Sequence, residues 1–330
     1  MSDLQKTPFV RELASSDRKT RDKALESLTN FLRAKTDLSL LDLLKLWKGL
    51  FFCFYHSDRP LTQQALARAL SYSLVPTLPR STLHQFLRAF WITISRDFHS
   101  LDRLRLDKYL FLIRCYVGVG FEVFIKQNSE TGKGKKGEKK RKREAEANQH
   151  GNKKKKSKRD SDAGKEQGND DENGDENEEV ESKYPGLTSY ISILEEGPLY
   201  PFDFDPDQEP ADDGAGGSVS IPHGPDGLRY HIMDIWIDEL EKVFEFEEVE
   251  QPGEGDEATP QRKIKGDVPM DLLLRPIGTL RTKGLHKPVR TRATETLEDE
   301  RLVEWGIKER KADKNEDEES EDEWGGFGDD

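Results

Sequence analysis

Three short patterns in this sequence contain residue types that can bind nucleotides or metal ions. The first is GKGKKG at Gly132–Gly137, which has the glycine spacing of the dinucleotide-binding fingerprint. That fingerprint works only between a strand and a helix, because the helix N-terminus must receive the pyrophosphate. Here the glycines lie in a lysine-rich run with few apolar residues, so nucleotide binding is not predicted.

The second pattern is an incomplete calcium loop. Asp203, Asp205 and Asp207 have the one-three-five spacing of calcium ligands. Gln208 stands where such a loop needs glycine, and Gly214 stands where it needs a bidentate glutamate. The sequence therefore predicts no calcium site in this stretch.

The third pattern is the C-x-x-H pair formed by Cys53 and His56. No second pair of ligands follows at the spacing of a zinc site, so both are interpreted as core residues of a buried helix. The seven histidines include no adjacent Ser/Cys–His–Asp pattern, and no catalytic triad is predicted. The sequence thus predicts a protein that is not an enzyme and that uses no metal, cofactor or small-molecule substrate.

Dense basic clusters carry more information than these patterns. Clusters of this kind serve as nuclear import signals or nucleic-acid patches, although a purely solubilising charge run is the alternative. The acidic run at 160–182 could shield them or engage basic partners such as ribosomal proteins or histones. The import candidates are Lys139, Lys140, Arg141, Lys142, Arg143, Lys153, Lys154, Lys155, Lys156, Lys158 and Arg159.

A smaller basic group opens a predicted helix. Arg103, Arg105 and Lys108 lie in its first turns, and the latter two share a face because they are three residues apart. They could contact RNA phosphates. Ion pairs with Asp102 or Asp107 are an equally good interpretation, so both remain open.

A second basic group lies near the C-terminus. The stretch 272–294 contains six Lys/Arg and no acidic residue, which is enough for a phosphate-binding stripe. No aromatic residue interleaves with them, so base stacking is not indicated there. The candidates are Arg275, Arg281, Lys283, Lys287, Arg290 and Arg292.

Apolar residues at helical spacing predict the elements that position these groups. Residues 1–125 contain 60 hydrophobic residues and predict helices that begin near 17, 39, 60, 81 and 102. The interval of about 21 residues gives roughly 42 per helical pair, within the period of HEAT-type repeats. The predicted fold is all-α, with stacked HEAT- or armadillo-like helical hairpins; an irregular helical bundle is the alternative.

The remaining chain divides by composition. Residues 128–182 contain four hydrophobic residues, too few to offset chain entropy, so this charged insert is predicted to be disordered. Helices are predicted again from Pro225 and near 269–282, 287–296 and 298–305. The predicted regions are a helical repeat at 1–127, the insert at 128–182, a continuation of the helical domain at 183–249, a loop with short basic helices at 250–312 and a disordered acidic tail at 313–330.

The charge distribution and the cysteine content indicate the kind of compartment in which the protein resides. The net charge of −13 conceals a basic N-terminal region, since residues 1–125 carry 19 Lys/Arg against 12 Asp/Glu. Cys53 and Cys115 are the only cysteines and both lie in apolar runs, which favours a reducing compartment. The sequence shows neither a signal peptide nor a run of about 20 apolar residues, so a soluble intracellular protein is expected.

Three ordered segments resemble the nucleolar ribosomal RNA processing protein 1 family. They are LWKGLFFCFYHSDRPLTQQALARAL, FWITISRDFHSLDRLRLDKYLFLIRCYV and PDGLRYHIMDIWIDELEKV. The similarity covers roughly 8–125 and 225–246, with a weaker part over about 269–305. It implies an α-helical repeat fold, a nucleolar location and a non-catalytic role in maturing the large ribosomal subunit. The long charged insert departs from the family pattern, and the family supplies no catalytic motif.

Together these observations predict a nuclear and nucleolar assembly factor. Its expected partners are precursor large-subunit ribosomal RNA, ribosomal proteins and other assembly factors, with no membrane. The alternative is a helical-repeat nuclear adaptor for import or chromatin proteins. Sedimentation with large precursor particles favours the first, and association with import receptors or nucleosomes favours the second.

Overall fold

The structure is a computed structural model that describes four stretches of the chain. They are residues 12–147 without 14, 16 and 36, then 181–202, 221–249 and 261–308. For 127–147, 248–249 and 261 it describes the backbone. The predicted acidic tail lies outside these residues.

The N-terminal helices begin within one residue of the predicted positions. Three of them are capped by side chains: Asp17 accepts from the backbone N–H of Thr20, Ser39 from that of Asp42 and Asp102 from that of Arg105. Local capping chemistry therefore sets these boundaries. The helices are α2 (Arg18–Ala34), α3 (Leu40–Tyr55), α4 (Pro60–Arg68, extended by a π-helical turn at Ala69–Ser73), α5 (Arg80–Asp97) and α6 (Arg103–Ala147).

The C-terminal half adds five helices and one short ribbon within the described ranges. The helices are α8 (Pro185–Glu196), α9 (Asp226–Val243), α10 (Met270–Lys283), α11 (Lys287–Leu297) and α12 (Glu300–Glu304). Strands β1 (Phe246–Val249) and β2 (Gln261–Ile264) pair antiparallel, with Phe246 opposite Ile264.

The described part of the chain is mostly helical, as predicted, and the short ribbon is an element that the all-α prediction did not include. Glu247 lies opposite Lys263, and opposite charges at paired positions favour antiparallel pairing. Four-residue strands leave no measurable alternation of apolar and polar residues, so their pairing was not visible in the sequence.

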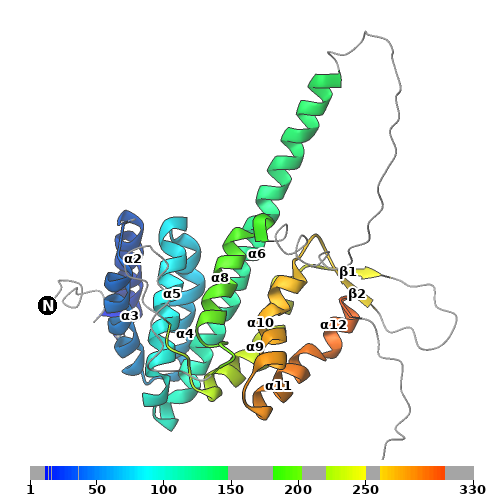
Figure 1. Ribbon diagram of the computed structural model, residues 1–330. Helices are drawn as coiled ribbons and strands as arrows, with labels where there is room; N and C mark the ends of the chain where they lie inside the picture. The colour runs from blue at the N-terminus through cyan, green and yellow to red at the C-terminus, as the bar shows by residue number, and fades with distance from the viewer. Residues whose placement is uncertain are drawn as a thin grey trace, which may run out of the picture.

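The helices stack in two layers (Figure 1). Helices α3, α5, α8 and α10 follow one another in one layer, and α4, α6, α9 and α11 follow one another in the other. Alternate helices therefore pack side by side along the stack, which is what successive helical hairpins produce. Assignment to the HEAT or armadillo type stays a prediction.

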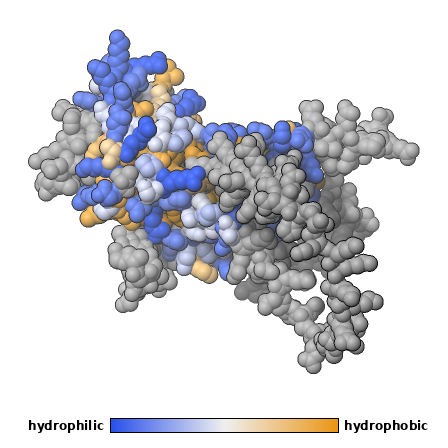
Figure 2. All heavy atoms as spheres, turned by 90° about the horizontal axis from the view of Figure 1, so that it is seen from above, coloured by the Kyte–Doolittle hydropathy of each residue, from blue (hydrophilic) through white to orange (hydrophobic). Residues whose placement is uncertain are grey.

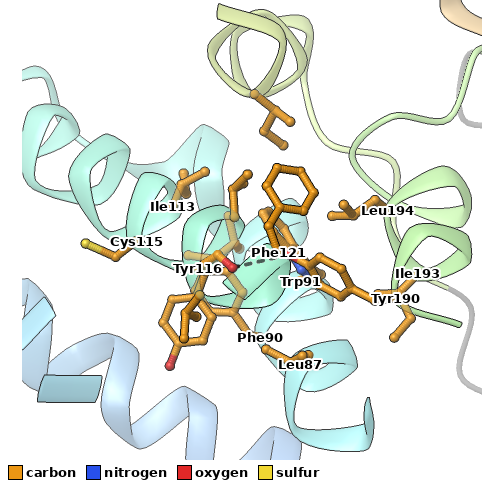
Figure 3. Packing of buried hydrophobic residues seen from close by; sticks show 14 of the residues in the cluster. Leu87, Phe90, Trp91, Ile113, Cys115, Tyr116, Phe121, Tyr190, Ile193 and Leu194 are labelled. Atoms are coloured by element: carbon orange, nitrogen blue, oxygen red, sulfur yellow. Dashed lines mark hydrogen bonds between the residues drawn. The ribbon is translucent and has the colours of Figure 1, made fainter. Parts of the chain in front are cut away.

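One apolar core runs through this stack. On the face shown in Figure 2, hydrophilic residues cover much of the described surface and smaller hydrophobic areas lie between them. Inside, Phe90 of α5 stacks on Tyr116 of α6 at 3.7 Å between ring centroids (Figure 3). Phe121 of α6 meets Trp236 of α9 at 4.9 Å, edge to face. The helices after the insert thus share the core of the helices before it.

Helix α6 is longer than the sequence predicted. Disorder was expected from residue 128, whereas the backbone is helical through Ala147 and extends beyond the other helices (Figure 1). Lys, Arg, Glu and Ala dominate 138–147 and all favour helix. The packed N-terminal part of α6 serves as the helix nucleus. Each further residue then extends an existing helix, which is far less unfavourable than starting a new one. The rest of the predicted insert, 148–180, lies outside the described residues.

Candidate nucleic-acid interface

Lys108 closes the C-terminal end of α3 instead of facing solvent. Its Nζ donates to the carbonyl oxygens of Tyr55 at 2.7 Å and Ser57 at 3.0 Å, and it lies 3.5 Å from a carboxylate oxygen of Asp58. The side chain is 4% exposed, and this burial lowers the pKa of the ammonium. Lys108 satisfies carbonyl oxygens at and just beyond the end of α3, so its role here is structural.

Arg105 is held beside Lys108. Its Nη1 donates to the Asp102 carboxylate at 2.6 Å, and its guanidinium lies 4.3 Å from the centre of the Tyr55 ring. The hydrogen bond from Arg105 lowers the pKa of Asp102. Arg103 is exposed. Arg105 therefore forms the ion pair with Asp102 that the alternative interpretation expected. Lys108 instead meets Asp58 and two carbonyl oxygens.

Two of the C-terminal candidates are held by carboxylates from distant parts of the chain. Arg275 donates to both oxygens of Glu195 at 2.9 Å and to Glu181 at 2.6 Å. Arg292 donates to both oxygens of Asp234 at 2.8 Å. These pairs join α10 to α8 and α11 to α9, so both arginines stabilise the stack.

Arg290 fixes the turn between α10 and α11. Its Nη1 donates to the carbonyl oxygens of Gly284 and Leu285, each at 2.7 Å. A Cβ on Gly284 would lie 2.5 Å from the carbonyl oxygen of Leu280, so the close approach requires glycine. The backbone of this turn is therefore tightly constrained.

Arg281, Lys283 and Lys287 surround that turn and are exposed. Within the described part of the chain, none of their side chains makes a hydrogen bond or ion pair. A phosphate could bind them without breaking an internal contact. We call these three residues the basic turn.

The predicted import clusters fall at the edge of what the structure describes. Lys139–Arg143 lie on the described backbone of α6. Lys153–Lys156, Lys158 and Arg159 lie outside the described residues.

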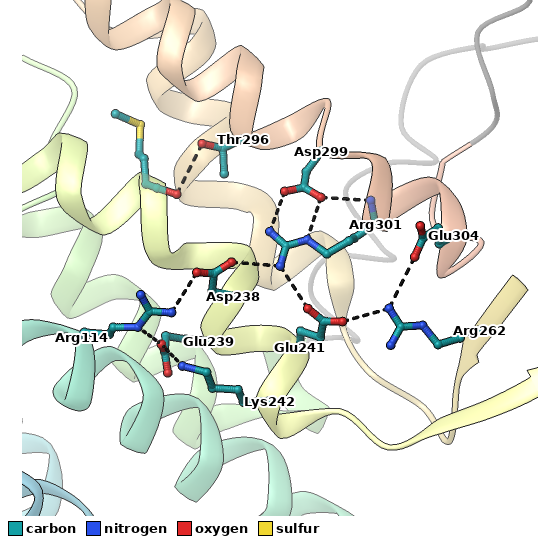
Figure 4. A network of polar contacts seen from close by, with 11 residues as sticks. Arg114, Asp238, Glu239, Glu241, Lys242, Arg262, Thr296, Asp299, Arg301 and Glu304 are labelled. Carbon is teal, nitrogen blue, oxygen red and sulfur yellow. Dashed lines mark hydrogen bonds and ion pairs between the residues drawn. The ribbon is translucent and has the colours of Figure 1, made fainter. Parts of the chain in front are cut away.

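A network of ion pairs, which the sequence analysis missed, ties α6 to the C-terminal segments (Figure 4). Arg114 donates to Glu239 at 2.5 Å and to Asp238 at 2.8 Å. Arg301 donates to Asp238 at 2.9 Å and to Glu241 at 3.0 Å, and the network continues to β2. Glu239 is 1% exposed. A carboxylate on the apolar stripe of α9 was the only sequence signal for it.

The described residues also form a pocket that the sequence did not indicate. It has a volume of about 450 Å³ and opens between the C-terminal end of α5 and the N-terminal end of α9. Its walls come from separate segments, so no local pattern could predict it. They are formed by Ser95, Arg96, His99, Phe202, Pro222, His223, Gly224, Pro225, Asp226 and Arg229.

The cysteines are buried, as the sequence analysis expected. Burial raises the pKa of Cys53 to about 12 and, as its largest cause, that of Cys115 to about 11, so neither thiol is a nucleophile at neutral pH. Within the described ranges, no cluster of three or more His, Cys, Asp or Glu side chains could hold a metal ion. No helix in those ranges combines the length and apolarity needed to cross a membrane.

Comparison with known proteins gives a consistent set of relatives. Residues 4–137 and 218–326 match the family described as nucleolar protein, Nop52. Human ribosomal RNA processing protein 1 homolog B is 39% identical over 125 residues, which are 36% of this chain and 16% of that protein. Human homolog A is 36% identical over 127 residues, 37% of this chain and 28% of that protein.

A more distant relative matches a similar length. The Dictyostelium discoideum ribosomal RNA processing protein 1 homolog is 27% identical over 130 residues, covering 39% of this chain and 26% of that protein. The matched part thus spans less than a third of each of these relatives. Because the family match extends over most of this chain in two ordered segments, the chain belongs to the Nop52, or ribosomal RNA processing protein 1, family of nucleolar proteins, as the sequence predicted.

Proposed function

We propose that this protein is a non-catalytic assembly factor that binds precursor ribosomal RNA and neighbouring proteins during maturation of the large ribosomal subunit. Family membership supports a role in ribosome biogenesis, since the curated relatives are named ribosomal RNA processing proteins. The expected partners are the precursor RNA, ribosomal proteins and other assembly factors of that subunit.

The basic turn is the observation that best supports direct contact with RNA. Arg281, Lys283 and Lys287 are exposed, and Arg290 fixes the backbone between them. Cations on a constrained backbone bind phosphate with little loss of conformational entropy. Each phosphate that they neutralise releases condensed counterions, which makes the affinity depend on salt.

Two exposed leucines offer a surface for protein partners. Leu61 near the start of α4 is 83% exposed and Leu104 near the start of α6 is 93% exposed. Helices α4 and α6 pack against each other. We propose that these two leucines contact a protein partner, as expected of a factor that joins RNA to proteins.

A salt titration tests the RNA contact. Filter binding would compare the full chain with a variant in which Arg281, Lys283 and Lys287 are changed to Gln, using a precursor large-subunit RNA fragment. The variant should bind more weakly, and its salt slope should fall by up to about three units, roughly one per lost phosphate contact.

The matched control removes three exposed charges elsewhere. Lys19, Lys23 and Arg33 on α2 are exposed, and changing them to Gln should leave the affinity and the slope nearly unchanged. If both triple variants lose RNA affinity equally, the affinity depends on net charge and not on the basic turn. Recovery of the protein with import receptors or nucleosomes, and not with large precursor particles, would contradict the proposal and favour a nuclear adaptor.

A further inference from the structure

The pocket between α5 and α9 has flat, partly apolar walls. Phe202 is 43% exposed, and its ring centre lies 5.6 Å from that of Tyr200. The ring of Tyr200 stacks on His223 at 3.9 Å with 13° between the planes. Burial, together with the positive charge of Arg229, lowers the pKa of His223, so this wall is neutral at neutral pH. Such surfaces suit a flat heteroaromatic ring.

Ser95 contributes to the same pocket wall, and its hydroxyl is buried just beneath the pocket surface. Ser95 is 2% exposed, and its Oγ has no hydrogen-bond partner among the described residues. A buried polar group left without a partner is unfavourable. A ligand that carries its own donors and acceptors could bond Ser95 once a small shift of this wall uncovers the Oγ, while its rings contact the apolar wall. Nucleobases combine these two properties.

The pocket adjoins the basic turn. Leu285 lies between Lys283 and Lys287 of the basic turn. Its backbone N–H donates to the carbonyl oxygen of Pro201 at 3.3 Å. Pro201 directly precedes Phe202, so the backbone between α10 and α11 contacts the segment that forms one wall of the pocket. Phosphates bound at the basic turn would therefore bring the adjacent bases to the mouth of the pocket.

We propose that this pocket receives an unpaired base of the RNA strand whose phosphates lie on the basic turn. The inference rests on the proposed function, since it requires the chain to bind RNA. A volume of about 450 Å³ lies in the range of small-ligand sites. Bases stacked inside a duplex cannot enter it, so the chain selects single-stranded over duplex RNA. Aromatic stacking without sequence-specific hydrogen bonds tolerates any base.

Fluorescence anisotropy with two probes tests the proposal. The full chain would be titrated with a short single-stranded oligouridine and with a duplex RNA of the same length. Phe202→Ala should weaken oligouridine binding at least about fivefold and leave duplex binding and the salt slope unchanged. Ser95→Ala should weaken oligouridine binding about two- to tenfold without lowering the thermal midpoint, because no internal hydrogen bond is lost.

Phe52→Ala is the matched control, since Phe52 is 49% exposed and does not line the pocket. It should leave both affinities unchanged. If the wild-type chain binds RNA and Phe202→Ala has no selective effect on oligouridine, the inference is wrong and the proposed function stands. If the wild-type chain binds neither probe, both are wrong. If Phe202→Ala abolishes recovery of assembly proteins while oligouridine binding is unchanged, the pocket takes a peptide and the inference is overturned.

Discussion

Changing Lys108 to Met separates the structural interpretation of the first basic group from an RNA-binding one. Methionine keeps much of the apolar stem but removes the donor to the carbonyl oxygens of Tyr55 and Ser57. Hydrogen bonds to charged groups contribute roughly 1.5–3 kcal/mol each, and desolvation of the ammonium offsets part of this. The free energy of unfolding should therefore fall by about 2–3 kcal/mol.

Urea denaturation followed by circular dichroism measures this loss, and thermal denaturation should show a midpoint about 4–12 °C lower. Lys48→Met on α3 is the control, because Lys48 is exposed and a surface change of this kind alters stability by less than about 0.5 kcal/mol. Filter binding to RNA at a temperature where both variants are folded should give wild-type affinity. The reasoning is refuted if Lys108→Met is as stable as the wild type, or if it loses RNA binding while remaining stable.

Three further predictions concern the core, the ion pairs and the insert. Trp236→Ala should lower the free energy of unfolding by about 3–5 kcal/mol, because the ring is buried against Phe121 and its Nε1 donates to the Leu273 carbonyl oxygen; a loss under about 1 kcal/mol in urea denaturation would contradict the shared core. The hydrogen bond from Arg301 lowers the pKa of Asp299 below 3.8, so this pair stabilises the fold above pH 3.8 and loses its contribution as the pH falls through the lower pKa of the folded state. Asp299→Asn should flatten the dependence of stability on pH in that acidic window, and a curve parallel to that of the wild type would count against the pair. Changing Lys153–Lys156, Lys158 and Arg159 to Gln should reduce nuclear accumulation of a fluorescent fusion, whereas unchanged uptake would mean that the protein enters with a partner.

Helix positions were predictable because their causes are local. Asp17 and Ser39 cap α2 and α3 within three residues of the groups they bind, and apolar spacing marks the buried face of each helix. Such signals can be read from a single window of sequence. The starts of the N-terminal helices were accordingly predicted to within one residue.

The role of each cation was not predictable in the same way. Arg275 and Glu195 are 80 residues apart, and Arg292 and Asp234 are 58 apart. Whether such a cation faces solvent or a carboxylate depends on which helices pack together, which local spacing does not determine. The pocket could not be predicted for the same reason, because its walls come from the end of α5, the segment after α8 and the start of α9.

Ultraviolet crosslinking in purified large-subunit precursor particles tests the central claim most directly. Mass spectrometry of the RNA-linked peptides would identify which segment of the chain touches the RNA. We predict crosslinks in peptides that contain the basic turn at 281–287, and their loss in the Arg281, Lys283 and Lys287 to Gln variant. Particles that contain the protein but give no crosslink between its described residues and RNA would contradict the account, since the chain would then reach the particle through protein contacts alone.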